Sequence, residues 1–114
     1  MAQLSIGTTL DERQMAEKER IKVVKSDRLS FAQTRRAGVF AARLIGSVDS
    51  STQNIAVVDL EAGAHVEDHE IGRCESIYVV KGAVDVEFDE GSELLLPGDL
   101  VYFPKGTSHS LTPR

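Results

Sequence analysis

Short strand-like segments separated by turn residues constrain the fold of this chain most strongly. From residue 53 onward there are seven such segments, at 54–60, 64–70, 75–81, 83–88, 92–96, 99–103 and 107–111. Turn sequences stand between them, such as Pro97-Gly98 and Pro104-Lys105-Gly106. Many short strands at this spacing are typical of a β-sandwich or barrel. The chain of 114 residues is also too short for two domains of ordinary size, so we predict a single all-β domain.

The N-terminal part has a different pattern. Thr9–Arg20 begins with a Thr9-x-x-Glu12 capping box and contains few apolar residues, which predicts a short, mostly solvated helix. Apolar, strand-like segments follow at 21–24 and 38–45. We therefore expect an N-terminal segment with a short helix at residues 1–20, followed by the β-domain at residues 21–114.

The distribution of charge weighs against nucleic-acid binding. The net charge of the chain is −5, made up of +3 over residues 1–58 and −8 over residues 59–114. An acidic half repels phosphate backbones and attracts cations. The basic residues Arg35, Arg36 and Arg43 have no interleaved aromatic residues on which bases would stack. We expect them to be exposed arginines on strands and a turn.

Cysteine content and hydropathy indicate the compartment. Cys74 is the single cysteine, so no disulfide forms within the chain, and a reducing cytoplasm is the expected location. Residues 1–10 are too short and polar for a signal peptide, and no apolar run reaches the length of a membrane span. We expect no membrane partner.

Five residues of types that bind metals lie in the C-terminal half: His65, Glu67, His69, Glu75 and His109. Imidazole and carboxylate together suit first-row divalent metals. Strict strand alternation would place the first three of these on one face. By the same alternation, Cys74 should lie on the face opposite Glu75 and have a structural role.

Two spacings in this region resemble the motifs of the cupin superfamily. The first runs Gly63-x5-His69-x-Ile71-x3-Glu75-x6-Gly82, with Ile71 where the family usually has a second His. The second runs Gly98-x5-Pro104-x-Gly106-x2-His109, and Pro113 replaces its closing Asn. Fifteen residues separate the two motifs, as in small microbial cupins.

The resemblance implies a double-stranded β-helix, the cupin jelly-roll barrel, with one divalent metal ion (Fe, Mn, Ni or Zn) inside. The matching ligands are His69, Glu75 and His109, which is the 2-His-1-carboxylate composition of non-haem iron sites. A second register places Glu67 and His69 in the two histidine positions, so that Glu67 becomes a fourth ligand. His65 lies outside the motif.

Residues 21–113 also resemble a narrower branch, the cupin domain of ethanolamine-utilisation proteins, in Asp49-Ser50-Ser51 and in Phe103-Pro104-Lys105-Gly106. That branch lacks most metal-binding histidines, whereas this chain retains His69 and His109. Two functions stay open. One is a metal-dependent oxygenase, isomerase or lyase acting on a small polar organic molecule, and the other is a metal-free cupin that binds a ligand for sensing or scaffolding.

Two predicted strands are apolar on both faces, at Ile77–Val80 and Leu100–Phe103. One face would line the barrel, which leaves the other to be covered by a second surface. The second motif also ends close to Arg114, where most cupins continue into another strand. We therefore predict a homodimer.

Overall fold

A computed structural model describes residues 1–9, 19–70 and 74–114, with residues 67–70 described by their backbone only. It contains ten strands and one turn of 3-10 helix within these residues. Their bounds are β1 Ala2–Thr9, η1 Ser26–Arg28, β2 Ala32–Gln33, β3 Val39–Ile45, β4 Gln53–Leu60, β5 Val66–Glu70, β6 Glu75–Lys81, β7 Val84–Phe88, β8 Gly91–Leu95, β9 Leu100–Phe103 and β10 Ser108–Pro113.

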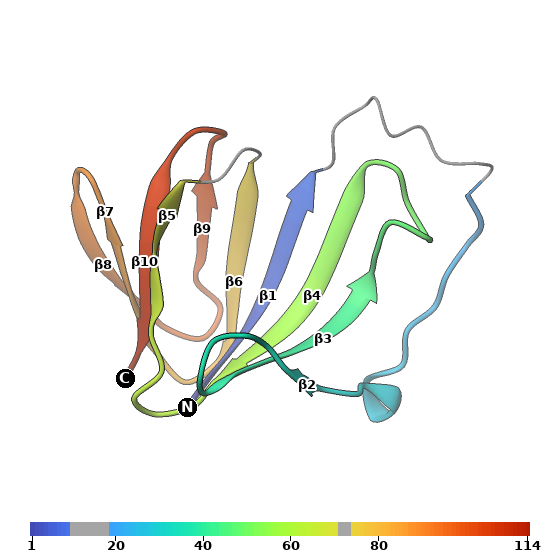
Figure 1. Cartoon of the computed structure of the whole chain (residues 1–114), viewed down its shortest axis with the longest axis horizontal. Helices are drawn as coiled ribbons and strands as arrows, with labels where there is room; N and C mark the ends of the chain where they lie inside the picture. Colours follow the sequence, from blue (N-terminus) through green and yellow to red (C-terminus); the bar gives the residue numbers. More distant parts are fainter. Residues whose placement is uncertain (10–18, 71–73) are drawn as a thin grey trace.

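The strands form two sheets that face each other. One has six strands in the order β2-β3-β4-β1-β6-β9, and the other has four in the order β5-β10-β7-β8. Figure 1 shows the larger sheet fanning from β6 through β1 and β4 to β3, with the smaller sheet beside it. All the strand pairs are antiparallel. The predicted all-β jelly-roll fold is confirmed.

The core lies between the two sheets because the strands alternate apolar and polar positions. Its fully buried side chains are Leu4, Leu60, Ile77, Val79, Val84, Val86 and His109. His109 is the single ionisable residue in this group. The interior is therefore apolar apart from the residues described below.

The seven strands predicted from residue 53 onward are all present, with ends that differ by at most about three residues. Strand β3 matches the predicted segment 38–45. The segment 21–24, in contrast, forms no strand, and Ile21 and Val23 are exposed to solvent. A short apolar run forms a strand only where a neighbouring strand can pair with it, and none lies beside this segment in the sheet order.

Strand β1 was not expected from the sequence. It pairs with β4 on one side and with β6 on the other, with Leu4 opposite Val58 and Val79. Residues 2–9 are thus an internal strand of the larger sheet, whereas we had placed residues 1–20 before the β-domain. Most of the predicted helix at 9–20 lies outside the described residues.

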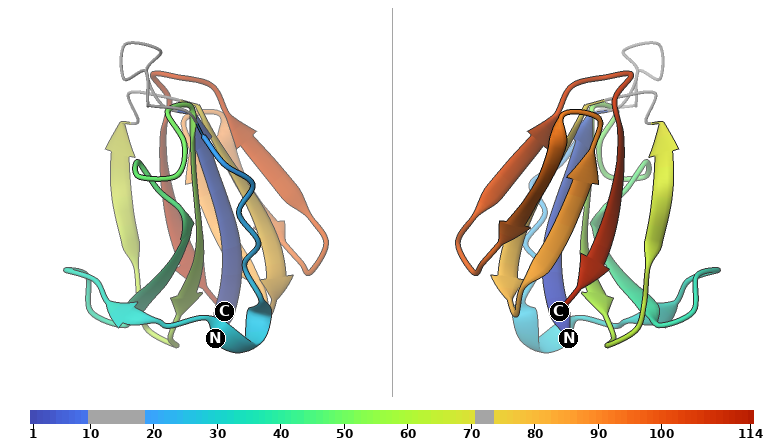
Figure 2. Two further views of the ribbon diagram at one scale, coloured as in Figure 1. Left: turned by 90° about the vertical axis from the view of Figure 1, so that its right-hand side faces the viewer. Right: turned by 90° about the vertical axis from the view of Figure 1, so that its left-hand side faces the viewer.

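Gly82 shows why the first motif closes on glycine. Its φ is +72°, a conformation that other residues rarely adopt. A Cβ atom at this position would also collide with the backbone carbonyl of Met1, immediately before β1. The glycine therefore lets the turn after β6 approach the start of β1, and Figure 2 shows these two ends close together in both views.

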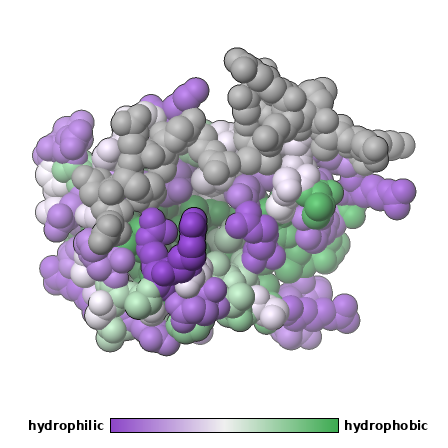
Figure 3. All heavy atoms as spheres, in the orientation of Figure 1, coloured by the Kyte–Doolittle hydropathy of each residue, from purple (hydrophilic) through white to green (hydrophobic). Residues whose placement is uncertain are grey.

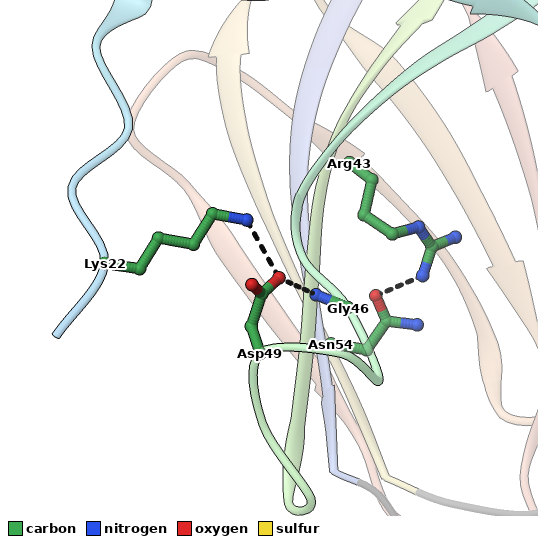
Figure 4. Close-up of polar contacts among 5 residues, drawn as sticks. All are labelled: Lys22, Arg43, Gly46, Asp49 and Asn54. Carbon is green, nitrogen blue, oxygen red and sulfur yellow. Dashed lines mark hydrogen bonds and ion pairs between the residues drawn. The ribbon is translucent and has the colours of Figure 1, made fainter. Parts of the chain in front are cut away.

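Polar contacts hold the segment after residue 18 against the β3–β4 loop. The Lys22 ammonium lies 2.8 Å from the Asp49 carboxylate, which also accepts a hydrogen bond from the backbone N–H of Gly46 (Figure 4). These contacts lower the pKa of Asp49, with the hydrogen bond from Lys22 as the largest cause. The Glu19 carboxylate accepts a second hydrogen bond from the backbone N–H of Ser51, at 2.6 Å.

Candidate functional site

A cavity of about 200 Å³ lies between the two sheets. Both sheets and the turn before β3 contribute its lining, which consists of Ile6, Thr34, Arg36, Val39, Ala41, Val58, Leu60, Val66, Glu75, His109 and Leu111. Most of these side chains are apolar. The ionisable ones are Arg36, Glu75 and His109, so the chemistry of the cavity is concentrated in three residues. In the space-filling view, hydrophilic residues stand in front of hydrophobic ones near the middle of the molecule (Figure 3).

Glu75 and His109 come together from opposite sheets. Glu75 begins β6 and His109 lies on β10. The His109 Nε2 atom is 3.1 Å from the Glu75 Oε1 atom. The His109 side chain is fully buried, and that of Glu75 is 13% exposed. A carboxylate and an imidazole therefore share a nearly dry site, as the spacing of the two motifs predicts.

Phe103 contacts this pair from a third strand. It is the cross-strand partner of Glu75 on β9, and its ring stacks on His109 with 4.0 Å between centroids and 7° between planes. Phe103 also borders a second cavity of about 300 Å³, together with Phe88 and Val101. The stacked rings thus lie between two cavities, and the contact restricts the plane of the imidazole.

The separation of Glu75 and His109 fits two ligands on one cation. Metal–ligand bonds of about 2.0–2.2 Å place neighbouring donors about 3 Å apart, close to the 3.1 Å observed. Imidazole nitrogen and carboxylate oxygen are also the donors that first-row divalent metals accept. The described side chains contain no cluster of three or more metal-binding residues.

The backbone of His69 lies at the register position that the first motif requires. His69 is directly opposite His109 on the ladder between β5 and β10, and Val66 is opposite Leu111. Two steps along β10 therefore match three steps along β5, which places one extra residue at 67–68.

This irregularity corrects the predicted alternation along 64–70. Val66 is buried and lines the cavity, so its neighbour His65 lies on the other side of the strand. His65 is exposed, and its Nδ1 atom is 2.9 Å from the Thr112 hydroxyl. His65 is therefore not part of the cavity. For Glu67, the structure describes the backbone in β5, and Ile71 lies outside the described residues.

Cys74 lies away from the cavity, as strand alternation predicts. Its Sγ atom is 2.9 Å from the Thr9 hydroxyl at the end of β1. Hydrogen bonding to Thr9 is the largest cause of a lowered pKa for this thiol, with a smaller contribution from Tyr102. The hydrogen bond between Cys74 and Tyr102 is in turn the largest cause of a raised pKa for Tyr102.

Arg36 and Thr34 are cavity residues that the sequence did not predict as such. Arg36 is exposed, as we expect for all three arginines, and it also lines the cavity together with Glu75 and His109. Both residues belong to the turn between β2 and β3, which carries no motif. The sequence offers two adjacent arginines shortly before the turn residue Gly38, and nothing in it indicates which of the two, Arg35 or Arg36, lines the cavity.

Comparison with known proteins identifies the family. The cupin domain family matches residues 56–112, which is half of the chain. The chain belongs to the cupin family. The matched region contains Glu67, His69, Glu75 and His109.

Two solved structures resemble this cupin. KdgF from Halomonas sp. is 28% identical, with a TM-score of 0.64 over 78% of this chain and 80% of that one. An RmlC-like cupin from Shewanella frigidimarina NCIMB 400 is 19% identical, with a TM-score of 0.62 over 88% of this chain and 83% of that one. None of the curated proteins compared with the chain matches it. Within the described residues, no helix is long and apolar enough to cross a membrane.

Proposed function

We propose that this cupin binds one divalent metal ion (Fe, Mn, Ni or Zn) through His69, Glu75 and His109, and binds a small polar organic molecule in the cavity beside it. The observation that carries the proposal is the 3.1 Å separation of Glu75 Oε1 and His109 Nε2 inside an apolar interior. A carboxylate is costly in such an environment unless hydrogen bonds or a cation balance it, and a divalent ion held between Glu75 and His109 would supply that balance.

The register of β5 supports His69 as the third ligand. Its backbone is paired with that of His109, across one ladder of the smaller sheet. Two imidazoles and one carboxylate leave coordination positions open for substrate. A metal ion held in this way polarises a bound oxygen atom or takes part in redox chemistry, which is compatible with an oxygenase, isomerase or lyase.

The protein side chains have separate roles in this site. Glu75 brings negative charge into the cavity, and His109 offers a nitrogen donor whose ring plane is restricted by Phe103. The apolar side chains around them, such as Val58 and Leu111, limit the water that reaches the pair. Exclusion of water strengthens electrostatic interactions within the site.

Titration of Mn²⁺ into metal-free protein by calorimetry tests the proposal. We expect binding of one ion per chain, which His69→Ala and Glu75→Gln weaken by roughly 100-fold or more, because even residues that only support a ligand contribute about 10- to 100-fold. The matched controls are His65→Ala, a histidine outside the cavity, and Glu87→Gln, an exposed carboxylate on β7. Absence of Mn²⁺ binding together with absence of Fe, Ni or Zn from purified protein would overturn the metal site.

A metal-free ligand-binding cupin is the second candidate function. The apolar lining of the cavity favours it, because most small-molecule sites combine apolar walls with a few polar groups. The resemblance to ethanolamine-utilisation cupins supports this candidate, because that branch lacks most metal-binding histidines. Ligand binding that is unchanged by a chelator would support it over the metal-dependent activity.

We also propose that the protein is a homodimer, with the outer face of β6 and β9 as its interface. Tyr78 and Val80 on β6, and Leu100 and Tyr102 on β9, are exposed on this face. Large apolar side chains gathered on one surface are typical of an interaction site. A second copy of the chain presents the same face, so one surface covers the other in a two-fold dimer.

A further inference from the structure

Arg36 stands at the open end of the cavity that contains Glu75 and His109. Arg36 is exposed, whereas His109, which lines the same cavity, is fully buried. Arg36 also borders a depression on the surface, with Ala37, Gly63 and His65. An exposed residue that lines both the cavity and this depression lies at the entrance between solvent and the interior.

The turn that carries Arg36 is held in place by hydrogen bonds from both of its ends. The Gln33 amide donates to the Arg36 carbonyl at 2.8 Å. The Thr34 hydroxyl accepts from the Arg36 backbone N–H at 3.2 Å and donates to the Val39 carbonyl at 2.8 Å. The Thr34 hydroxyl is thus engaged in the turn, which leaves the guanidinium of Arg36 as the polar group offered to a ligand at this end.

The charge of Arg36 is available to such a ligand. Among the residues that the structure describes, no carboxylate forms an ion pair with Arg36, whereas Lys22 and Arg114 each have one. A guanidinium presents its donors as a planar fork that matches a carboxylate. Pairing with one carboxylate balances the charge and satisfies two donors at once.

The rest of the cavity limits the body of the ligand. The walls between Arg36 and the Glu75–His109 pair are aliphatic, formed by residues such as Val39, Ala41 and Leu60. A volume of about 200 Å³ corresponds to roughly seven water-sized groups at about 30 Å³ each. The space therefore suits a short organic acid.

We infer that the ligand of this cavity is a small monocarboxylate. Its carboxylate pairs with Arg36 at the entrance, and its short body extends toward Glu75 and His109. Arg36 is then the residue that determines specificity, and Thr34 positions it. The inference rests on the proposed function in taking this cavity as the ligand site, but it does not require a metal ion to be bound.

Three probes of similar size and different charge test the inference: butyrate, its isostere butyramide, and butylammonium. Each is titrated by calorimetry and by amide chemical shifts into chelator-treated protein, and again into Mn²⁺-loaded protein. Charged hydrogen bonds contribute about 1.5–3 kcal/mol, so we expect butyrate to bind at least roughly tenfold more tightly than butyramide in both preparations. Butylammonium should bind most weakly.

Variants of the same turn assign the effect to Arg36. Arg36→Gln should remove the preference for butyrate over butyramide, and Arg36→Lys should restore part of it, because lysine keeps the charge and lacks the fork. Arg35→Gln is the matched control, since Arg35 is an adjacent exposed arginine that does not line the cavity. Circular dichroism and thermal unfolding confirm that each variant folds.

The outcomes separate this inference from the proposed metal site. Equal affinity for butyrate and butyramide, no detectable binding of any probe, or an equal loss in Arg35→Gln and Arg36→Gln would overturn the monocarboxylate inference. If Mn²⁺ still binds in those cases, the metal site stands without it. A preference for butyrate that depends on Arg36, in protein that binds no metal ion, would support the inference and overturn the metal site alone.

Discussion

The imidazole of His109 lies parallel to the ring of Phe103, with 4.0 Å between the ring centroids. Phe103 is the cross-strand partner of Glu75, and Glu75 is the residue whose carboxylate approaches His109. The three side chains therefore support one another across the two sheets. Any change in one of them should be measurable at the other two.

Phe103→Leu should destabilise the protein by about 1–3 kcal/mol, because it removes an aromatic stack and leaves part of the ring volume empty between two cavities. The affinity for Mn²⁺ should also fall, since the imidazole of His109 loses the contact that restricts its plane. Chemical denaturation and calorimetry measure the two effects. The control is Phe40→Leu, because Phe40 lies on β3 and does not line the cavity. This variant should leave Mn²⁺ affinity unchanged. Similar changes in both variants would contradict the role of the stack.

Gly82→Ala should destabilise the protein more than Gly98→Ala. Both glycines have positive φ, at +72° and +92°, so both substitutions strain the backbone by about 1–2 kcal/mol. At Gly82 the added Cβ also meets the carbonyl of Met1, whereas Gly98 has open space. Urea unfolding should show an additional loss of about 1 kcal/mol or more for Gly82→Ala. Equal losses would mean that the start of β1 does not pack on this turn in solution.

Ile71→His should strengthen Mn²⁺ binding by at least roughly tenfold, while Glu67→Ala should change it little. The reason is the irregularity in β5, which falls at residues 67–68 and interrupts the alternation from His69 back to Glu67. The first motif register, in which Ile71 takes the place of a ligand, is therefore favoured over the one that uses Glu67. Calorimetric titration of both variants distinguishes them, and a large loss in Glu67→Ala with no gain in Ile71→His would reverse the assignment.

The contact between Lys22 and Asp49 should depend on pH in a defined direction. The pKa of Asp49 is lowered in the folded protein, so its stabilising contribution is present above the ordinary value of 3.8 and is lost as the pH falls through the lower folded value. A carboxyl chemical-shift titration by NMR should place the Asp49 midpoint below that ordinary value. Lys22→Met should raise the midpoint and Lys25→Met should not, because Lys22 is the largest cause of the shift. An unchanged midpoint in Lys22→Met would show that the ion pair does not form in solution.

Light scattering at micromolar concentration should give twice the chain mass. Leu100→Lys should convert the dimer to a monomer, because it places a charge in the exposed apolar face of β6 and β9. Val48→Lys is the control, since Val48 is also apolar and is more exposed than Leu100, but lies in the β3–β4 loop. A wild-type monomer would contradict the proposed interface.

Much of the fold followed from local patterns in the sequence. Strand alternation and turn glycines predicted each strand from β4 to β10 to within a few residues. The spacing of the two motifs also predicted that Glu75 and His109 would meet, because each lies at a defined number of residues from a turn. Periodicity and turn chemistry act over a few residues, and a single sequence contains both.

Non-local pairing decided the rest. Ala2, Leu4 and Ile6 alternate with polar residues or glycine, which is typical of a strand, but nothing within residues 2–9 indicates that this strand lies inside the sheet, because its neighbours β4 and β6 are more than 40 residues away in the sequence. The extra residue in β5 exists because β5 must match β10, and it moves His65 off the face that strict alternation assigned to it. Arg36 lines the cavity because the β2–β3 turn folds over the gap between the sheets, and a turn sequence does not encode which surface it will cover. The sequence by itself thus determined most of the strands and the donor residues of the site. The sheet order, the register of β5 and the position of Arg36 at the cavity entrance depend on contacts between distant segments. Only the tertiary structure establishes those contacts.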